Sequence, residues 1–581
     1  MERGIERRRW AGDVLAAVAL AVVLALCWTA RDWHNLSALR LPDTDDAVRL
    51  QQIRDWLGGQ RFDDLTQHRL GPPPGLPMHW SRLADLVPGA IIAALTPLAG
   101  SHAAELIAVL VWPTLLFAAA LTLTARIARV LGGDAIARTA IVVAGVAYPS
   151  TTVFAPGRID HHGFQVVLLL VVIRALLARP TMRAGLVAGL ATAASLVIGL
   201  ETAPLLVAAG ALLALDWLSV RAGTDDRMMG FGIGATVGLL AASVVFRSDQ
   251  WLYPACDGFT EMAWRAEVTC AFAPLALALA AHGVTRPGRR AVLAVAIGGV
   301  IVAGAVMMSS TCLSPYGSVD PLLRRLWLAR VLEAQPLFAT PAATAIGYAG
   351  VMIAGIVASV WVTARVRDRR WAMLLALQVV TLGLTCWQVR GAYGGAILAG
   401  PSLAAVIAAA RARGAAWMAG AWIASAGMLY PIAAQALLPH RSAAPPVGSA
   451  GSAVACDSPE ALALFAAQPT GRLLAPLDLG AYALAASRLD VAGAPYHRDN
   501  LGNLAVYHAF LGTPEQAAAV VRNWRVRYVA LCADSFAELP SMPRFAGQLH
   551  AGHAPAWLHA VGTRGALTLY AVVPGRLPTY R

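Results

Sequence analysis

The chain has 581 residues, of which 58% are hydrophobic and only 14% are charged, whereas soluble domains carry about 25% charged residues. This composition argues against a water-soluble fold. The net charge of +13 comes entirely from arginine, because the sequence contains no lysine; the arginines lie in small groups between apolar runs, so the charge indicates membrane topology rather than nucleic-acid binding.

The apolar segments predict about thirteen membrane-spanning helices, since about 20 apolar residues cross a bilayer as a helix. The segments are centred near residues 20, 115, 144, 171, 191, 210, 238, 276, 300, 352, 379, 401 and 426. A cleaved signal peptide is the alternative for the first segment, but its removal would leave the acidic loop that follows without an anchoring helix.

The arginine groups fall in alternate connections between these segments, as the positive-inside rule requires of cytoplasmic loops. The groups are Arg7, Arg8 and Arg9; Arg126 and Arg129; Arg179 and Arg183; Arg221 and Arg227; Arg286, Arg289 and Arg290; Arg365, Arg367, Arg369 and Arg370; and Arg411 and Arg413. We therefore predict a multi-pass protein of the bacterial inner membrane, with a cytoplasmic N-terminus and a periplasmic C-terminal part.

This topology divides the chain into three parts. They are a transmembrane domain at residues 1–438 with a long first outer loop at 31–103, a Pro/Gly/Ser-rich linker at 439–455, and a periplasmic mixed α/β domain at 456–581. Within the last part, the patterns predict a helix at 514–524, a strand at 526–532 and a hairpin at 557–573 around residues 562–565. An oxidising exterior would permit a disulfide between Cys456 and Cys532.

Three carboxylates open the first outer loop in the run Asp43-Thr44-Asp45-Asp46. Such a cluster becomes favourable when a divalent cation neutralises it, and hard oxygen ligands suit Mg²⁺ or Mn²⁺. The alternative is a solvated helix N-cap before residues 47–57, where aspartate is also favoured.

The same loop carries a proline-stiffened stretch that ends in Met78-His79-Trp80-Ser81-Arg82. His79, Trp80 and Arg82 offer hydrogen bonding, stacking and anion pairing, which suit sugars and phosphates. A Trp and an Arg at the level of the lipid headgroups would show the same pattern.

An Asp followed by two histidines lies in the second outer loop, at Asp160, His161 and His162. Ionisable residues at a membrane surface are candidates for function. The pair lacks the spacing of helical zinc ligands, so we expect Asp160 to be an oxygen ligand and the histidines to contact substrate.

Two charged residues in later loops complete the candidate site residues of the transmembrane domain. Glu333 is an acid in an otherwise apolar and basic stretch, and a solvated side chain is the alternative for it. Arg390 lies at the outer end of a helix, where the positive-inside rule disfavours arginine. A guanidinium there would clamp a lipid-linked phosphate, or it would snorkel to the interface.

The terminal domain contributes two polar segments. Asp478 lies in Pro476-Leu477-Asp478-Leu479-Gly480, and Tyr496, His497 and Arg498 lie in a run that continues to Asp499 and Asn500. We interpret these side chains as substrate-binding, with a capped turn as the alternative at Asp499 and Asn500.

The order of these motifs resembles the GT-C glycosyltransferases, and more narrowly the catalytic subunit of oligosaccharyltransferase. An acidic motif follows the first helix, a second Asp motif follows the third, and a glutamate lies in a long later loop. An arginine lies on the outer face of the membrane, two helices before the last one. A soluble domain then follows about thirteen helices, so the resemblance extends over nearly the whole chain.

The resemblance implies a role for each motif. Asp45, Asp160 and Glu333 take the places of the catalytic, metal-binding acids, with Mn²⁺ or Mg²⁺ as the cofactor. The resemblance gives Arg390 the contact with the donor phosphate, and from their own chemistry we expect Arg82 and His162 to bind it as well. We expect the substrate to be bound by Asp43, His79, Trp80, His161, Asp478, Tyr496, His497 and Arg498, of which Asp478 and the run from Tyr496 to Arg498 also match polar segments of the family.

The family's WWDYG motif is degenerate here, since Pro476 and Leu477 replace its two tryptophans. Asparagine glycosylation of protein therefore does not follow from the resemblance. We expect a sugar or oligosaccharide to pass from a polyprenyl phosphate or pyrophosphate in the bilayer to a glycan, lipid or protein acceptor. The alternatives are a single-sugar transferase that modifies lipid A or protein hydroxyls, a transporter or flippase, and a polysaccharide polymerase or ligase.

Overall fold

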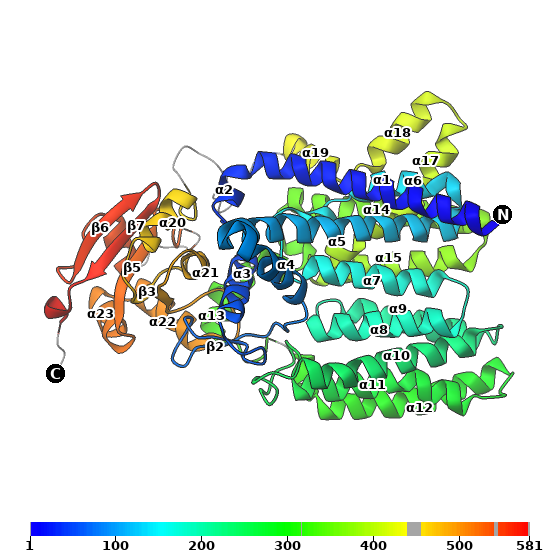
Figure 1. Cartoon of the computed structure of the whole chain (residues 1–581), viewed down its shortest axis with the longest axis horizontal. Coiled ribbons are helices and arrows are strands. Elements are labelled where there is room, and N and C mark those ends of the chain that lie inside the picture. The colour runs from blue at the N-terminus through cyan, green and yellow to red at the C-terminus, as the bar shows by residue number, and fades with distance from the viewer. Residues whose placement is uncertain (1, 315, 439–454, 538, 540–543, 579–581) are drawn as a thin grey trace.

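The structure is a computed structural model that describes residues 2–314, 316–438, 455–537, 539 and 544–578. It consists of a helical bundle and a smaller domain that contains the main β-sheet (Figure 1). The first helix, α1 (Glu2–Arg31), runs along the bundle from the end opposite to this domain. The N-terminus and the C-terminal domain therefore lie on opposite sides of the bundle.

Eight segments of the described chain are long and apolar enough to span a membrane, which makes the protein a multi-pass membrane protein. They are Trp10–Arg31 of α1, α5 (Ser101–Gly132), α10 (Thr224–Val245), α11 (Glu261–Ala280), α12 (Pro287–Met308), α14 (Ala342–Val366), α15 (Arg369–Trp387), and the run Gly391–Arg411, which combines α16 (Gly391–Gly395), η6 (Ile397–Ala399) and α17 (Gly400–Arg411).

The other five predicted segments fall on shorter helices. These helices are α6 (Asp134–Gly145), α7 (His162–Leu177), α8 (Met182–Ile198), α9 (Ala203–Leu218), and the pair α18 (Ala415–Ser425) and α19 (Leu429–Leu437). In Figure 1, α7, α8 and α9 run beside the long helices. The loops that carry Asp160 and Glu201 interrupt these apolar stretches, so part of each stretch is loop and the helix within it is shorter.

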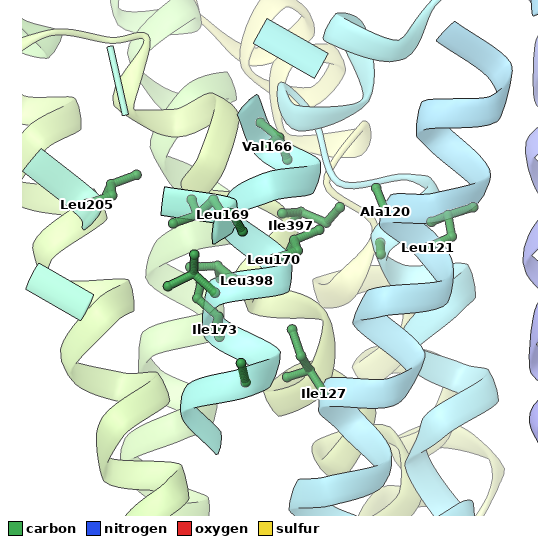
Figure 2. Packing of buried hydrophobic residues seen from close by; sticks show 14 of the residues in the cluster. Ala120, Leu121, Ile127, Val166, Leu169, Leu170, Ile173, Leu205, Ile397 and Leu398 are labelled. Atoms are coloured by element: carbon green, nitrogen blue, oxygen red, sulfur yellow. The ribbon is translucent and has the colours of Figure 1, made fainter. Parts of the chain in front are cut away.

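Side chains at the centre of the bundle are closely packed. Figure 2 shows leucine and isoleucine side chains of α7 together with side chains of α5 and of residues 397 and 398, and all of the labelled side chains are buried. By contrast, Val292, Val295 and Val300 on α12 are more than two-thirds exposed, as expected of a surface that faces lipid.

Glycines bring α8 and α10 into contact. Gly185 and Gly189 of α8 lie on one face, and a Cβ atom at either would stand 2.1 or 2.3 Å from a carbonyl oxygen of α10. Gly230 and Gly234 repeat the arrangement on α10, where a Cβ would stand 2.3 or 2.5 Å from carbonyls of α8. Each helix thus carries a small-xxx-small pair, the device by which membrane helices approach closely without a hydrophobic driving force.

The C-terminal domain contains a five-stranded sheet in the order β4-β3-β5-β7-β6. The strands are β3 (Arg472–Leu474), β4 (Asp490–Val491), β5 (Val526–Cys532), β6 (Leu558–Arg564) and β7 (Leu567–Val572). The first three are parallel, and the last two add an antiparallel hairpin. The helices are α20 (Pro459–Ala466), α21 (Leu477–Ala486), α22 (Asn500–Leu511), α23 (Pro514–Asn523), α24 (Arg544–His550) and η7 (Pro574–Arg576).

The predicted elements of this domain are confirmed. The helix and the strand are α23 and β5, and the Cys456–Cys532 disulfide is formed. The hairpin turns at Gly565, the last residue of the predicted range, and Gly562 lies within β6 where the pairing with β7 shifts. A second disulfide, Cys256–Cys312, joins two loops of the bundle.

The remaining elements lie in the loops between the bundle and the terminal domain. They are α2 (Trp33–Ser37), α3 (Thr44–Leu57), β1 (Thr66–Gln67), β2 (Leu76–Pro77), α4 (Leu86–Ala99), η1 (Ser150–Phe154), η2 (Ser310–Leu313), α13 (Pro321–Leu326), η3 (Leu328–Arg330), η4 (Leu332–Ala334) and η5 (Leu337–Ala339). The predicted first outer loop thus contains three helices and a two-stranded ribbon.

Arginines attach the terminal domain to these loops. Arg69 donates to the carbonyls of Leu484, Ser487 and Leu489, which lie at and after the C-terminus of α21. The Arg40 guanidinium pairs with Asp457. Hydrogen bonds also link the backbone around Leu70 to Val491 of β4. The domain is therefore seated on the first outer loop rather than tethered by its linker alone.

Asp499, the N-cap of α22, is expected to make stability pH-dependent. Burial raises its pKa to about 7, although the amide of Gly502 donates to Oδ1 and opposes the shift. Between about pH 4 and pH 7 the folded protein keeps a proton that the unfolded chain releases, so stability falls as pH rises through this window, by at most about 1.4 kcal/mol per pH unit.

Asp499→Asn keeps a good N-cap and removes the titration. Its unfolding midpoint in detergent should match the wild type near pH 5 and exceed it near pH 8. The exposed Asp534→Asn is the matched control, and equal pH profiles of the wild type and Asp499→Asn would refute the assignment.

Candidate active site

Asp43 begins the helix that presents the acidic motif. Its side chain accepts from the backbone N–H of Asp45 at 3.1 Å, so it is the N-cap of α3, and the helix begins at Thr44. The N-cap alternative is therefore correct for Asp43. The same carboxylate is 2.9 Å from Arg158 in the second outer loop, which gives Asp43 a structural partner where substrate binding was expected.

Asp46 ties the first outer loop to the second. It is fully buried, and its Oδ1 accepts from the backbone N–H groups of Ile159 at 2.7 Å and Asp160 at 2.8 Å. These bonds set the position of the Asp160 loop relative to α3. The sequence pattern does not single out Asp46, because one acid in a run of three cannot be told from its neighbours by pattern alone.

Arg158 joins three of the carboxylates. Its guanidinium pairs with Asp43, with Asp46 at 3.4 Å and with Asp160. Although burial lowers the pKa of an arginine, these carboxylates raise that of Arg158 well above its usual value. The signal that could have found Arg158 is the one that singled out Arg390, an arginine in a predicted outer loop.

Asp160 is buried and charged. It accepts from the backbone N–H of His162 at 3.0 Å, at the start of α7. Burial alone would raise its pKa, but Arg158 and the two neighbouring histidines outweigh burial and lower the pKa to about 2.

The two histidines have different partners. His161 Nδ1 is 3.3 Å from Arg49, and its Nε2 is 3.2 Å from Glu201. His162 Nε2 is 3.6 Å from Glu333. The ring centroids lie 4.4 Å apart, so two histidines adjacent in sequence connect two acids from different loops.

Glu333 and Arg390 meet across two loops. Their side chains are 3.8 Å apart, and the Arg390 backbone N–H donates to the Glu333 carbonyl at 3.2 Å. Burial would raise the pKa of Glu333, but His162 and Arg390 lower it to about 2. Arg390 also donates to the Tyr316 hydroxyl at 2.6 Å and to the Gln388 side chain at 3.0 Å, so it is held in place rather than snorkelling.

Asp45 shares this environment with the other acids. Burial raises its pKa well above the usual value, and Asp43, Glu333 and Asp160 raise it further. The structure thus brings the three predicted catalytic acids, Asp45, Asp160 and Glu333, into one electrostatic neighbourhood. Within the described chain, no Arg, Lys or His side chain forms an ion pair with Asp45.

Among the aromatic residues predicted to bind substrate, Tyr496 lies near Asp45, and His79 and Trp80 pack against Tyr496. Tyr496 is buried with its hydroxyl against Asp45, and its ring meets Trp80 edge-on at 5.4 Å. Trp80 is 2% exposed and lies 4.6 Å under the guanidinium of Arg49. His79 lies 5.1 Å from the His497 ring, and burial lowers its pKa well below the usual value.

Two predicted binding arginines have structural positions instead. Arg82 is 2% exposed and donates to the carbonyls of Phe62, Gln52 and Asp64 and to Asp85, so burial withdraws it from a donor phosphate. Arg498 makes a two-pronged pair with Asp257, at 2.8 and 2.5 Å.

His497 and Asp478 are the two other residues of the terminal domain that are predicted to bind substrate. Both lie away from the immediate contacts of Asp45, Asp160 and Glu333. His497 pairs with Asp257 as well, although its ring faces His79 and Tyr316. Asp478 is exposed in the first turn of α21.

The donor set fits a divalent cation in its chemistry. Several hard carboxylate oxygens surround Asp45, and their mutual repulsion is what a cation would relieve. As the side chains stand, no group of three or more His, Cys, Asp and Glu in the described parts of the chain is arranged to hold a metal ion. Arg158, His162 and Arg390 are the cationic partners of Asp160 and Glu333 in this arrangement.

Comparisons with known proteins identify the fold. No family model matches the chain, and no curated protein is significantly similar to it. Among solved structures, the apo oligosaccharyltransferase of Archaeoglobus fulgidus is similar over 98% of this chain and 75% of its own, with a TM-score of 0.65 and 14% identity.

Two further structures from that organism agree. The oligosaccharyltransferase AglB in complex with an inhibitory peptide and a dolichol-phosphate matches 97% of this chain and 75% of its own, with a TM-score of 0.63 and 13% identity. A complex with Zn and sulfate matches 97% of this chain and 73% of its own, with a TM-score of 0.62 and 12% identity. The chain therefore shares its fold with the archaeal oligosaccharyltransferase structures, in agreement with the resemblance found in the sequence.

Asp46→Ala should loosen the second outer loop. It removes the acceptor of two backbone N–H groups and a partner of Arg158, and each hydrogen bond to a charged group contributes about 1.5–3 kcal/mol. Hydrogen exchange of the amides of Ile159 and Asp160 should accelerate in this variant. Asp46→Asn, which keeps an acceptor oxygen, is the milder control, and unchanged exchange in Asp46→Ala would show that Asp46 does not hold the loop.

Proposed function

We propose that the protein is an integral-membrane glycosyltransferase, which transfers a sugar or oligosaccharide from a polyprenyl phosphate or pyrophosphate to an acceptor at the outer face of a bacterial inner membrane. The observation that carries this proposal is the meeting of Asp45, Asp160, Glu333 and Arg390, which come from four separate segments between the bundle and the terminal domain. The similar AglB structure, which holds a dolichol-phosphate and a peptide, supports it.

Arg390 is suited to the departing phosphate. It is held by Tyr316 and Gln388, and its pairing with Glu333 is loose at 3.8 Å. A preorganised guanidinium stabilises negative charge as that charge develops on the leaving group. We assign to Arg390, with His162 beside Glu333, the contact with the donor phosphate.

Asp45 is suited to the acceptor. Burial and the neighbouring acids raise its pKa well above the usual value, which makes it a stronger base than a free carboxylate. The acceptor hydroxyl or amine attacks the sugar carbon, the bond from that carbon to the phosphate oxygen breaks, the proton passes to Asp45, and the electron pair leaves with the phosphate. Tyr496 is buried near this carboxylate.

Asp45, Asp160 and Glu333 are the residues that would hold Mn²⁺ or Mg²⁺. The ion, when bound, would supply positive charge to the donor phosphate. This proposal includes domain limits at residues 438 and 456, a cytoplasmic N-terminus and a periplasmic terminal domain.

The acceptor class is left open by the site. Pro476 and Leu477, where the family has two tryptophans, give no reason to expect asparagine glycosylation. A single-sugar transferase and a polysaccharide polymerase or ligase would use the same donor chemistry. A transporter would place its charges on broken helices near the middle of the membrane, whereas the acids assigned here lie in loops and at the start of α3.

Asp45→Asn and Glu333→Gln should each reduce transfer from a lipid-linked donor by about a hundredfold or more, because each removes charge from the reacting centre while keeping its shape. Transfer is measured with membranes that contain the purified protein and donor lipids extracted from the source cells. Glu261→Gln, at the half-buried start of α11, is the matched control. Wild-type transfer in both site variants would exclude the mechanism.

Chelation should abolish transfer, and Mn²⁺ or Mg²⁺ should restore it, because the acids alone repel a phosphate. Titration of the purified protein with Mn²⁺, followed by electron paramagnetic resonance, should show one tight site that Asp160→Asn weakens at least tenfold. If transfer persisted in chelator and no Mn²⁺ bound, the metal assignment would be wrong while the roles of Arg390 and Asp45 stood.

A further inference from the structure

Glu201 is an acid that the mechanism above does not use. It lies between α8 and α9, and its side chain is 18% exposed. One carboxylate oxygen is 3.2 Å from His161 Nε2, and the other accepts from the side-chain amide of Gln165 at 3.1 Å. A carboxylate has about four acceptor positions, so these two contacts leave acceptor capacity unused.

Both direct partners of Glu201 are neutral. An arginine N–H can only donate, so the contact of Arg49 with His161 Nδ1 requires Nδ1 to be the acceptor and puts the ring proton on Nε2. His161 Nε2 therefore faces Glu201 at 3.2 Å without carrying a charge. Although burial would raise the pKa of Glu201, the contact with His161 and the charges of His162 and Arg390 hold it well below the usual value, so the carboxylate is ionised.

Gly199 sets the position of this carboxylate. A Cβ atom at residue 199 would lie 2.4 Å from Oε2 of Glu201, closer than non-bonded atoms approach. The backbone of Gly199 is extended (φ 168°), so any residue could adopt it. Space for the Glu201 carboxylate, not backbone freedom, is the reason this position suits glycine.

The carboxylate is within electrostatic reach of the proposed phosphate site. Arg390 and His162 both act on Glu201, and Glu201 acts on His79. His79 in turn lies 5.1 Å from the His497 ring, which meets Tyr316 edge-on at 5.4 Å, and Tyr316 accepts from Arg390. Flat polar rings and a fixed carboxylate are the side chains that recognise the hydroxyl groups and faces of sugars.

We propose that Glu201, held by Gly199, His161 and Gln165, accepts a hydrogen bond from a hydroxyl or amino group of the donor sugar, and so selects glycosylated over sugar-free lipid phosphate. This inference rests on the proposed function, since it assumes a lipid-linked donor whose phosphate lies at Arg390. It assigns recognition of the sugar to a residue separate from the three acids of the reacting centre.

Competitive lipid binding tests the assignment without turnover. The full chain in nanodiscs is equilibrated with undecaprenyl phosphate and with the polyprenyl-phosphate sugar fraction extracted from the source cells, and the retained lipids are quantified by mass spectrometry. The wild type should retain glycosylated over sugar-free lipid. Glu201→Gln should reduce that ratio about tenfold, the effect of one hydrogen bond to a charged group, and should still retain undecaprenyl phosphate.

Gly199→Ala is the second variant, because it keeps the charge of Glu201 and displaces its carboxylate. It should lower the ratio in the same direction, whereas Glu261→Gln should leave the ratio unchanged. Retention of undecaprenyl phosphate by each variant is the internal measure that its fold is intact.

The outcomes separate the two proposals. If the wild type retained the glycosylated lipid and both variants retained it equally well, the role of Glu201 would be wrong and the donor proposal would stand. If the wild type retained neither lipid, the donor proposal would be wrong, and the role of Glu201 with it.

Discussion

The contact on which the site depends is that of Arg158 with Asp43, Asp46 and Asp160. One guanidinium neutralises carboxylates from two loops that are more than a hundred residues apart in sequence. Burying any of these charges alone would be costly, and each is tolerable because the others are present. The position of α3 on the Asp160 loop, and with it the approach of Asp45 to His162 and Glu333, follows from this mutual neutralisation.

The terminal domain is part of the site rather than an appendage. It supplies Tyr496 to Asp45, and its attachment relies on arginines that bind carbonyls and on the pairing of Arg498 with Asp257. Guanidinium groups suit this task, because they hold several acceptors in one plane and remain charged when buried. The geometry of the candidate site is therefore a property of the interface between the bundle and the domain.

The sequence located the acids but not their partners. Asp45, Asp160, Glu333 and Arg390 could be found because acids in predicted outer loops, and an arginine on the side where arginine is disfavoured, depart from the membrane pattern. Arg82 departs from the membrane pattern in the same way, but its guanidinium is buried among backbone carbonyl groups and not placed for a donor phosphate. Asp46, Arg158 and Tyr316 were missed as functional neighbours, because nothing in the spacing of residues reports which side chains meet across loops.

What the sequence determined by itself is the membrane bundle, the order of its motifs and the mixed domain at its end. Hydrophobicity, turn residues and charge act over a few neighbouring residues, so their patterns can be read along the chain. Tertiary structure decided how many segments form long helices, which arginines are structural, and that Gly199 makes room for a carboxylate. These outcomes depend on burial and on partners distant in sequence, since a side chain's charge has a role only once its neighbours are in place.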